Sequence, residues 1–144
     1  MASPLRHADV AVGTVLPPRR FVVHRLDLVR YCGASGDFNV IHWNERIATA
    51  VGLPDVIAHG MFTMAAAARV VTDWAVDPAA LVEYGVRFSK PVPVPDDDAG
   101  ATVEVAATVT EKLADGRVLV ELTATLAGGG GRVLSGARAV VQLS

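Results

Sequence analysis

Residues 59–74 read H-G-M-F-T-M-A-A-A-A-R-V-V-T-D-W, and this stretch decides the fold. Most of these residues are strong helix formers, and residues 61–68 carry no charge. A helix that is apolar on all sides is a buried helix, and this one is shorter than the roughly 20 apolar residues that span a membrane. The small side chains of residues 65–68 allow another backbone to approach closely. We therefore predict a central helix enclosed by the rest of the chain, with chemistry at its first turn, His59-Gly60.

The half of the chain before this helix has the pattern of short elements joined by turns. Proline before an extended run favours an edge strand or a strand start. Asp and Asn are typical N-caps, and Gly is typical just after a helix end. The predicted elements are a strand at 21–23 after Pro17-Pro18, a helix at 28–32 capped by Asp27 and ended by Gly33, a loop at 34–44, and a helix at 45–51 capped by Asn44 and closed by Gly52.

The half of the chain after this helix alternates with a period of two, which is typical of strands with one buried face. Asp115-Gly116 has the pattern of a tight hairpin turn, and residues 128–131 form a looser one. We predict a four-stranded antiparallel meander plus the short early strand, wrapped around one buried α-helix. This α+β architecture is the hot-dog fold, and we expect residues 1–144 to form a single domain. The predicted strands are 81–90, with Val82, Tyr84, Val86 and Phe88 on one face, 102–110, 118–126 and 135–143.

Composition excludes several classes of function. The chain has 144 residues, is 51% hydrophobic and carries a net charge of −2, so nothing in its charge favours binding to nucleic acid. Its one cysteine, Cys32, excludes an internal disulfide framework and fits a reducing compartment. The amino-terminal stretch M-A-S-P-L-R-H-A-D-V lacks the apolar segment of a signal peptide. We expect a cytoplasmic protein that does not associate with membranes.

The predicted loop carries the residues best suited to chemistry. Asp37 and His42 are five positions apart, and a carboxylate and an imidazole in one loop can share a water molecule and exchange protons with it. Asn39, between them, can hydrogen-bond without titrating. The Gly60 N–H lies at the positive end of the helix dipole, where it can stabilise a developing oxyanion. From the residues alone, the alternative is that Asp37 and Asn39 stabilise turns and that His42 is packed beside an aromatic side chain.

Other chemistries have weaker support in the sequence. His42, Asp55 and His59 lack the spacing of a zinc site, and we expect no metal and no cofactor. Ser35 and Cys32 have no base and orienting group at a convincing spacing. Asp96–Asp98 lacks the EF-hand pattern, and Gly128–Gly131 lacks the Lys-Ser/Thr of a phosphate-binding loop.

Four segments carry a resemblance to a known family. A-S-G-D-F-N-V-I-H-W-N at 34–44 and I-A-H-G-M at 57–61 resemble the signature loop and the helix start of the MaoC-like, (R)-specific enoyl-thioester hydratases. The similarity continues into E-Y-G-V-R-F at 83–88 and V-P-V-P at 92–95. Within the family, the chain is most similar to the catalytic beta subunits of (3R)-hydroxyacyl-ACP dehydratases of mycolic-acid-type fatty acid elongation. It departs from the family at Val40, where proline is usual.

The resemblance implies a reaction and assigns roles to residues. Asp37 and His42 become the catalytic pair, Asn39 a polar residue that shapes the site, and the Gly60 N–H the donor to a thioester carbonyl. No helix hydroxyl is assigned, because Ala65 stands where some relatives carry one. The implied reaction is the reversible dehydration of (3R)-3-hydroxyacyl thioesters, on acyl carrier protein or CoA, to trans-2-enoyl thioesters. The implied assembly is a homodimer, or a heterodimer with a related alpha-type subunit.

Three rival functions remain open at this point. A stand-alone homodimeric (R)-specific enoyl-CoA hydratase would use the same mechanism with a different carrier. A hot-dog thioesterase would need a carboxylate on the central helix, and residues 61–68 contain none. A non-catalytic partner subunit would supply an acyl-chain tunnel, and it would have no need of both Asp37 and His42.

Overall fold

The structure is a computed structural model that describes residues 5–144, and helix α3 (Gly60–Ala75) lies at its centre. The helix begins after His59 and ends at Val76, whose φ of 58° is left-handed, so its predicted bounds are confirmed. Within the described part of the chain, no helix is long and apolar enough to cross a membrane. Residues 1–4, which begin the stretch used for the signal-peptide expectation, lie outside the described residues.

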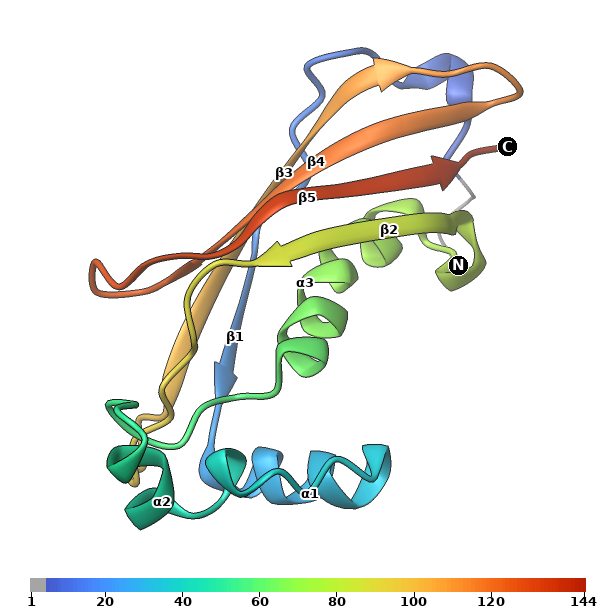
Figure 1. Ribbon diagram of the computed structural model, residues 1–144. Coiled ribbons are helices and arrows are strands. Elements are labelled where there is room, and N and C mark those ends of the chain that lie inside the picture. Colours follow the sequence, from blue (N-terminus) through green and yellow to red (C-terminus); the bar gives the residue numbers. More distant parts are fainter. Residues whose placement is uncertain (1–4) are drawn as a thin grey trace.

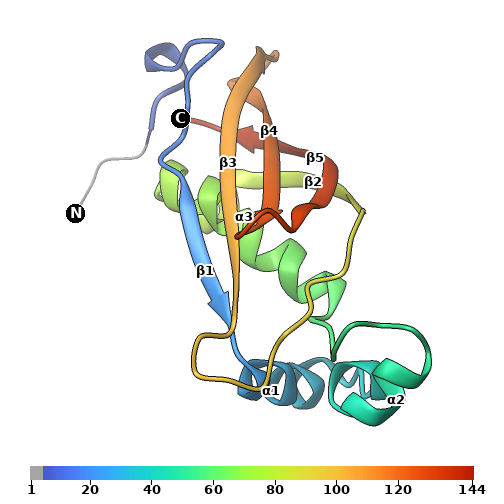
Figure 2. The ribbon, with the colours of Figure 1, turned by 90° about the vertical axis from the view of Figure 1, so that its left-hand side faces the viewer.

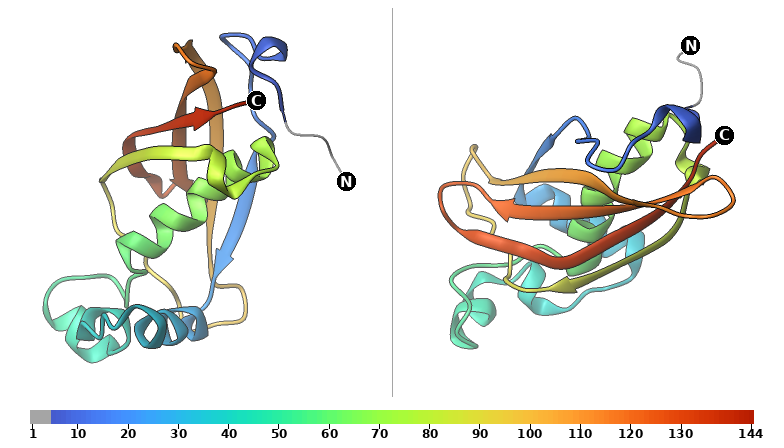
Figure 3. Two further views of the ribbon diagram at one scale, coloured as in Figure 1. Left: turned by 90° about the vertical axis from the view of Figure 1, so that its right-hand side faces the viewer. Right: turned by 90° about the horizontal axis from the view of Figure 1, so that it is seen from above.

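A five-stranded antiparallel sheet curves around one side of α3 (Figure 1). Seen from above, the strands form a layer that crosses the helix (Figure 3). Together with the central helix, this confirms the hot-dog fold. The strand order is β1-β3-β4-β5-β2. The strands are β1 (Arg19–Val23), β2 (Leu81–Phe88), β3 (Ala101–Lys112), β4 (Arg117–Leu126) and β5 (Gly131–Gln142).

The predicted four-stranded meander is wrong for its first strand. Strands β3, β4 and β5 follow one another as expected, but β2 pairs with β5 and not with β3. The segment after β2 is extended and pairs elsewhere: the Ala58 N–H donates to the Val92 carbonyl and the Val94 N–H to the Val56 carbonyl, both at 2.9 Å. Three prolines in this segment prevent a tight hairpin. The chain therefore passes the start of α3 before it enters β3.

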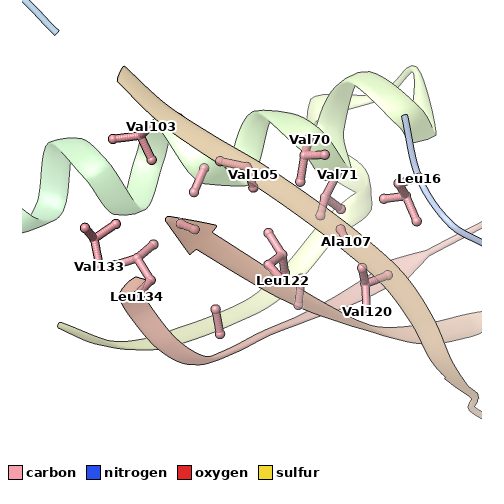
Figure 4. Close-up of a cluster of buried hydrophobic side chains, with 14 of the residues drawn as sticks. Leu16, Val70, Val71, Val103, Val105, Ala107, Val120, Leu122, Val133 and Leu134 are labelled. Atoms are coloured by element: carbon pink, nitrogen blue, oxygen red, sulfur yellow. The ribbon is translucent and has the colours of Figure 1, made fainter. Parts of the chain in front are cut away.

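The core lies between the concave face of the sheet and α3, and Figure 4 shows its centre. The predicted alternation is confirmed on the last three strands, whose inward side chains are all buried. Asp115 and Gly116 both have positive φ, as a type I′ hairpin turn requires. The buried side chains include, on α3, Ala67, Val70, Val71 and Ala75, and, on the sheet, Val103, Val105, Ala107, Val109, Val118, Val120, Leu122, Ala124, Ala137, Ala139 and Val141.

Helix α3 is not enclosed on all sides, which corrects the prediction. Met61, Ala65, Arg69 and Asp73 are exposed, and Met61 keeps 59% of its surface. These residues are four apart, so they form one stripe along the helix. The sheet covers the opposite side of the helix, and this stripe is open in the single chain.

Strand β2 also departs from simple alternation. Tyr84 and Val86 are half-buried as predicted, but Val82 and Phe88 are exposed. The register with β5 shifts between Leu81 and Glu83 and again after Gly85. Each shift disrupts the alternation of side chains between the two faces, which explains why two of the four predicted inward residues keep about half of their surface exposed.

Two short helices lie where α3 begins (Figure 2). The first, α1 (Arg25–Ser35), is longer than predicted: Asp27 lies in its first turn and accepts the His24 N–H, and Gly36, with φ of 76°, ends it in place of Gly33. The second, α2 (Glu45–Ala50), has its predicted Asn44 cap and Gly52 end. Three single turns of 3-10 helix complete the elements: η1 (His7–Asp9), η2 (Val40–His42) and η3 (Pro78–Ala80).

Arg25 holds this end of the molecule together. Its Nε donates to the Val94 carbonyl at 2.6 Å, and its guanidinium pairs with the carboxylates of Asp55 and Glu45. One partly buried cation thus joins α1, α2 and the extended segment before β3.

The two ends of the described chain meet at the opposite end of the sheet (Figure 1). The His7 N–H donates to the Ser144 carbonyl at 2.9 Å, and the Ser144 N–H donates to the Leu5 carbonyl at 3.3 Å. The functional residues predicted above lie far from both ends, near the start of α3.

Tyr84 links the edge strand β2 to the central helix, because its hydroxyl donates to the Met64 carbonyl at 3.0 Å. Burial raises the pKa of Tyr84 from 10 to about 12. We expect Tyr84→Phe to lower the free energy of unfolding by about 1 kcal/mol, the usual value of one such bond. In the wild type, stability should fall as pH rises above 10, because the unfolded tyrosine ionises first. Urea unfolding at pH 8 and pH 11 measures both effects, and Tyr84→Phe should lose less stability between these pH values.

Candidate active site

Loop 36–39 and the turn η2 hold Asp37 and His42 in fixed positions. The Asp37 N–H donates to Ser35 Oγ at 3.1 Å, and Asp37 Oδ1 accepts the Asn39 N–H at 3.1 Å. Asn39 Oδ1 accepts the Ile41 N–H at 3.3 Å and so caps η2. These local bonds are typical of Asx turns. They occupy one oxygen of Asp37 and leave Oδ2 free.

The free oxygen of Asp37 faces the imidazole of His42. The distance from Asp37 Oδ2 to His42 Nε2 is 4.0 Å; the carboxylate is half-exposed and the imidazole is buried. On its other side, His42 Nδ1 lies 2.7 Å from the Ile57 carbonyl, which can only accept, so Nδ1 carries the proton. In the neutral ring, Nε2 then has a free lone pair. The separation is too long for a direct hydrogen bond and lets one water molecule bond to both atoms.

A second histidine, His59, contacts both members of the pair. Its ring stacks on that of His42 with centroids 3.8 Å apart and an interplanar angle of 22°. Its Nε2 lies 3.1 Å from the Asp37 carbonyl and 3.6 Å from Cys32 Sγ. Burial lowers the pKa of His59, although its bond to the Asp37 carbonyl acts in the opposite direction. Burial also raises the pKa of the Cys32 thiol, and the negative charge of Asp37 adds to this.

A cavity of about 340 Å³ opens between the first turn of α3 and the end of β2. Gly60 and Thr63 line it from the helix, and His42 lines it from η2. A Cβ atom at Gly60 would lie 3.0–3.1 Å from ring atoms of Phe88, closer than ordinary contact, so glycine is needed for this approach. The rest of the lining is mostly apolar: Ile57, Ala58, Phe88, Ser89, Lys90, Pro91, Val92, Val133 and Leu134.

The structure brings together three of the four residues predicted for the site. Asp37, His42 and Gly60 lie around the start of α3, but only His42 and Gly60 line the cavity. Asn39 is exposed, and its side chain is used to cap η2. Its role in shaping the site stays a prediction.

Two side chains of the site were missed in the sequence. The Thr63 hydroxyl is buried on the cavity wall, although the position considered for a helix hydroxyl was Ala65. Its spacing of three from Gly60 would have placed it on the same helix face. His59 was placed at the first turn, where chemistry was expected, and was weighed as a metal ligand, but it was given no role in the site. Its stacking on His42 could not be read from residues 17 positions apart.

The carboxylate of Asp37 and the rings of His42 and His59 also offer the atoms of a possible metal site, all within 4.8 Å of one another. His59 Nε2 faces the Asp37 carbonyl and is therefore protonated, so this nitrogen offers no lone pair to a metal. Asp55, the third metal candidate from the sequence, is paired with Arg25 and lies outside this group. The observed hydrogen bonds thus favour proton transfer over metal binding.

Comparison with known proteins identifies the family of this chain. The sequence profile described as "MaoC like domain" matches residues 9–126. The 3-hydroxyacyl-thioester dehydratase X of Mycobacterium tuberculosis is 52% identical over 66 residues, which are 46% of this chain and 22% of that protein. The chain thus spans about a fifth of that relative, and 28% of the enoyl-CoA hydratase ChsH3 of the same organism, which is 29% identical over 89 residues.

Solved structures give the same result over nearly the whole chain. A MaoC-like dehydratase superposes with a TM-score of 0.89 at 39% identity, covering 98% of this chain and 43% of that one. A chain of the ChsH1–ChsH2 complex of M. tuberculosis superposes with a TM-score of 0.78 at 27% identity, covering 93% of this chain and 98% of that chain. Because the profile covers most of the sequence and the fold agrees, this chain belongs to the MaoC-like domain family.

Proposed function

We propose that this chain catalyses the reversible dehydration of (3R)-3-hydroxyacyl thioesters to trans-2-enoyl thioesters. The observation that carries the proposal is the placement of the Asp37 and His42 side chains, 4.0 Å apart, beside the cavity at the start of α3. The name of the M. tuberculosis dehydratase that shares 52% identity over part of the chain supports this reaction class.

The Gly60 N–H supplies the electrostatic part of the mechanism. The C2 proton of an acyl thioester is weakly acidic, so its removal needs stabilisation of the enolate-like oxygen. A backbone donor at a helix N-terminus meets that oxygen with a fixed dipole. The thioester carbonyl therefore binds at Gly60, and C2 and C3 lie toward His42.

Asp37 and His42 then move two protons. In the direction of elimination, one member of the pair takes the C2 proton, the electron pair forms the C2=C3 bond, and the C3–O bond breaks. The departing hydroxyl receives a proton and leaves as water. In the direction of hydration, the pair binds this water and delivers its hydroxyl to C3 and a proton to C2. Both proton transfers are assigned to the pair as a unit, with no separate role for either residue.

The positions of acidic groups argue against a thioesterase. The first two turns of α3 carry no carboxylate, and Asp73 lies near the far end of the helix, paired with Arg69 and Arg19. A non-catalytic partner subunit would not need a carboxylate and an imidazole facing one another. The geometry therefore favours hydration chemistry in this chain itself.

The setting of the reaction is inferred from the family resemblance. We place the reaction in fatty acid elongation, on either acyl carrier protein or CoA. The mostly apolar cavity wall suits the acyl part of such a substrate. The single cysteine, Cys32, supports a reducing, cytoplasmic setting.

The open stripe of α3 and the free edge of β2 support a dimer. Among the described residues, β2 pairs only with β5, so its other edge offers unpaired backbone groups. A second copy of the chain, or a related alpha-type subunit, would cover both. The solved ChsH1–ChsH2 complex of M. tuberculosis contains a chain that is 27% identical to this one.

Removing either member of the pair should abolish most of the activity. We expect Asp37→Asn and His42→Ala to lower kcat for hydration of crotonyl-CoA by about 10²–10⁴-fold, the usual contribution of acid–base groups. Loss of absorbance of the conjugated enoyl thioester measures the rate. Asp97→Asn is the matched control, because Asp97 Oδ1 also accepts backbone N–H bonds, in a turn outside the site. Full rate in either site variant contradicts the assignment, and release of free thiol without hydration supports a thioesterase.

The packing of Phe88 against Gly60 gives a second test. Gly60→Ala keeps the backbone N–H but places a methyl group 3.0–3.1 Å from the Phe88 ring on the cavity wall, so the ring must shift slightly. Because a misplacement of ~1 Å can cost about 10²-fold in rate, we expect a smaller loss of rate here. We expect Phe88→Ala to restore most of this loss in the double variant. Steady-state kinetics of the four proteins measure the coupling. Equal rates of the single and double variants would contradict this role of the ring.

The mass of the purified chain in solution tests the assembly. We expect light scattering to give a dimer. Replacing Met61 with Glu on the open stripe should shift the population toward monomer, because a charge would be buried in the interface. A monomer with full activity contradicts the need for a partner, and a monomer that gains activity only with an alpha-type subunit supports the heterodimer.

A further inference from the structure

We propose that His59 is a positioning residue for the Asp37–His42 pair: its neutral ring donates from Nε2 to the Asp37 carbonyl and stacks on the His42 ring. This inference rests on the proposed function, since it concerns the pair assigned to that reaction. It adds a third residue, which touches neither the cavity nor the substrate.

The position of His59 gives it contact with both members of the pair. As the residue before α3, it is fixed to the helix that carries Gly60, and only 1% of its surface is exposed. It meets Asp37 through the 3.1 Å hydrogen bond to the main chain and His42 through the 3.8 Å stack. One ring therefore fixes the loop, the imidazole and the oxyanion donor relative to one another.

The hydrogen-bond partners define the tautomer of His59. The Asp37 carbonyl can only accept, so Nε2 must carry the proton. Nδ1 is buried and has no hydrogen-bond partner among the described residues, so it remains a bare lone pair. The Cys32 thiol at 3.6 Å from Nε2 is a weak partner at most. His59 is therefore a neutral ring in which Nε2 donates a hydrogen bond and Nδ1 has no partner among the described residues.

The groups around His59 keep this ring neutral. Tyr31 and Cys32 face it from α1, and Asp37 and His42 face it from the loop and η2. Of these, Asp37 attracts a positive charge, whereas His42 and the burial of the ring oppose one. A neutral His59 also avoids placing a positive charge against His42 when His42 receives a proton from substrate or water.

The same neutrality makes His59 contribute to stability in a pH-dependent way. The pKa of His59 in the folded protein lies below its ordinary value of 6.5. Its contribution is therefore complete above about pH 6.5 and is lost as pH falls toward the folded value, because the unfolded chain then binds more protons.

Nitrogen-15 spectra of the histidine rings test the proposal without any substrate. At pH 7.5, in the wild-type protein, we expect His59 to be neutral with the proton on Nε2 and with Nδ1 bare. The Nδ1–H tautomer or a doubly protonated ring would overturn the proposal, because neither fits the observed contacts. If the wild type fails to hydrate crotonyl-CoA, the proposed function fails, whereas this spectrum still decides the bond to Asp37.

Three variants separate positioning from packing. His59→Phe keeps a stacked ring and loses the donor, His59→Gln keeps a donor that does not titrate, and His59→Ala loses both. We expect His59→Phe to lower kcat for crotonyl-CoA by about 10²-fold with little change in KM, as a misplaced catalytic group does. His59→Gln should recover most of the rate. Thermal unfolding from pH 7.5 to pH 5 should show a smaller loss of stability for both than for the wild type.

A purely structural role gives a different result. The variants would then unfold more easily, but kcat per folded molecule would match the wild type, and the phenylalanine and glutamine variants would not differ. That result overturns the proposal. Lower kcat in His59→Phe with recovery in His59→Gln supports it, and a monodisperse protein with an unchanged circular dichroism spectrum shows that both variants fold.

Discussion

The close packing of α3 against the curved sheet is the constraint on which the rest of the structure depends. Alanine and valine on the buried side of the helix let the strands approach, and the alternating valines of β3 and β4 fill the space between. A sheet that curves tightly around a helix leaves the ends of that helix uncovered. The first turn therefore remains available to the loop from α1 to α2 and to the segment after β2.

Those two segments make a reactive site from a helix end. The first brings a carboxylate and an imidazole, held by a turn bond to one oxygen of Asp37 and by the bond from His42 Nδ1 to the Ile57 carbonyl. The second begins after Phe88, which packs against Gly60, and forms part of the apolar wall. Neither segment has much regular structure, so Arg25, which joins α1, α2 and the second segment, keeps them together. The positions of the reactive groups are thus fixed by specific hydrogen bonds at the end of a rigid helix.

Local patterns in the sequence were sufficient for much of this fold. The bounds of α3, the alternation of β3 to β5 and the Asp115-Gly116 turn depend on neighbours along the chain, and all were predicted. The place of β2 in the sheet depends on long-range pairing. The prolines after β2 argue against a hairpin to β3, but they do not indicate which strand β2 pairs with. The exposed stripe of α3 was missed because its first half, Met61 and Ala65, is uncharged and does not show which side the sheet covers, although Arg69 and Asp73 mark its second half.

The site was likewise predictable only where its residues are close together in the sequence. Asp37 and His42 share one loop, so their proximity followed from the sequence, and the family resemblance strengthened it. The stacking of His59 on His42, the Thr63 hydroxyl on the wall and the ring of Phe88 against Gly60 depend on contacts between distant segments. Asn39 shows the opposite case: a polar residue in a suggestive loop is used by the backbone.

The pairing of the chain ends has a consequence for how this fold is combined with others. Leu5 and Ser144 are hydrogen-bonded neighbours at the end of the sheet away from the cavity. A further domain attached at either end, or a duplicate joined in tandem, would leave the mouth of the cavity unobstructed. Longer relatives can therefore contain the same unit with its cavity left open.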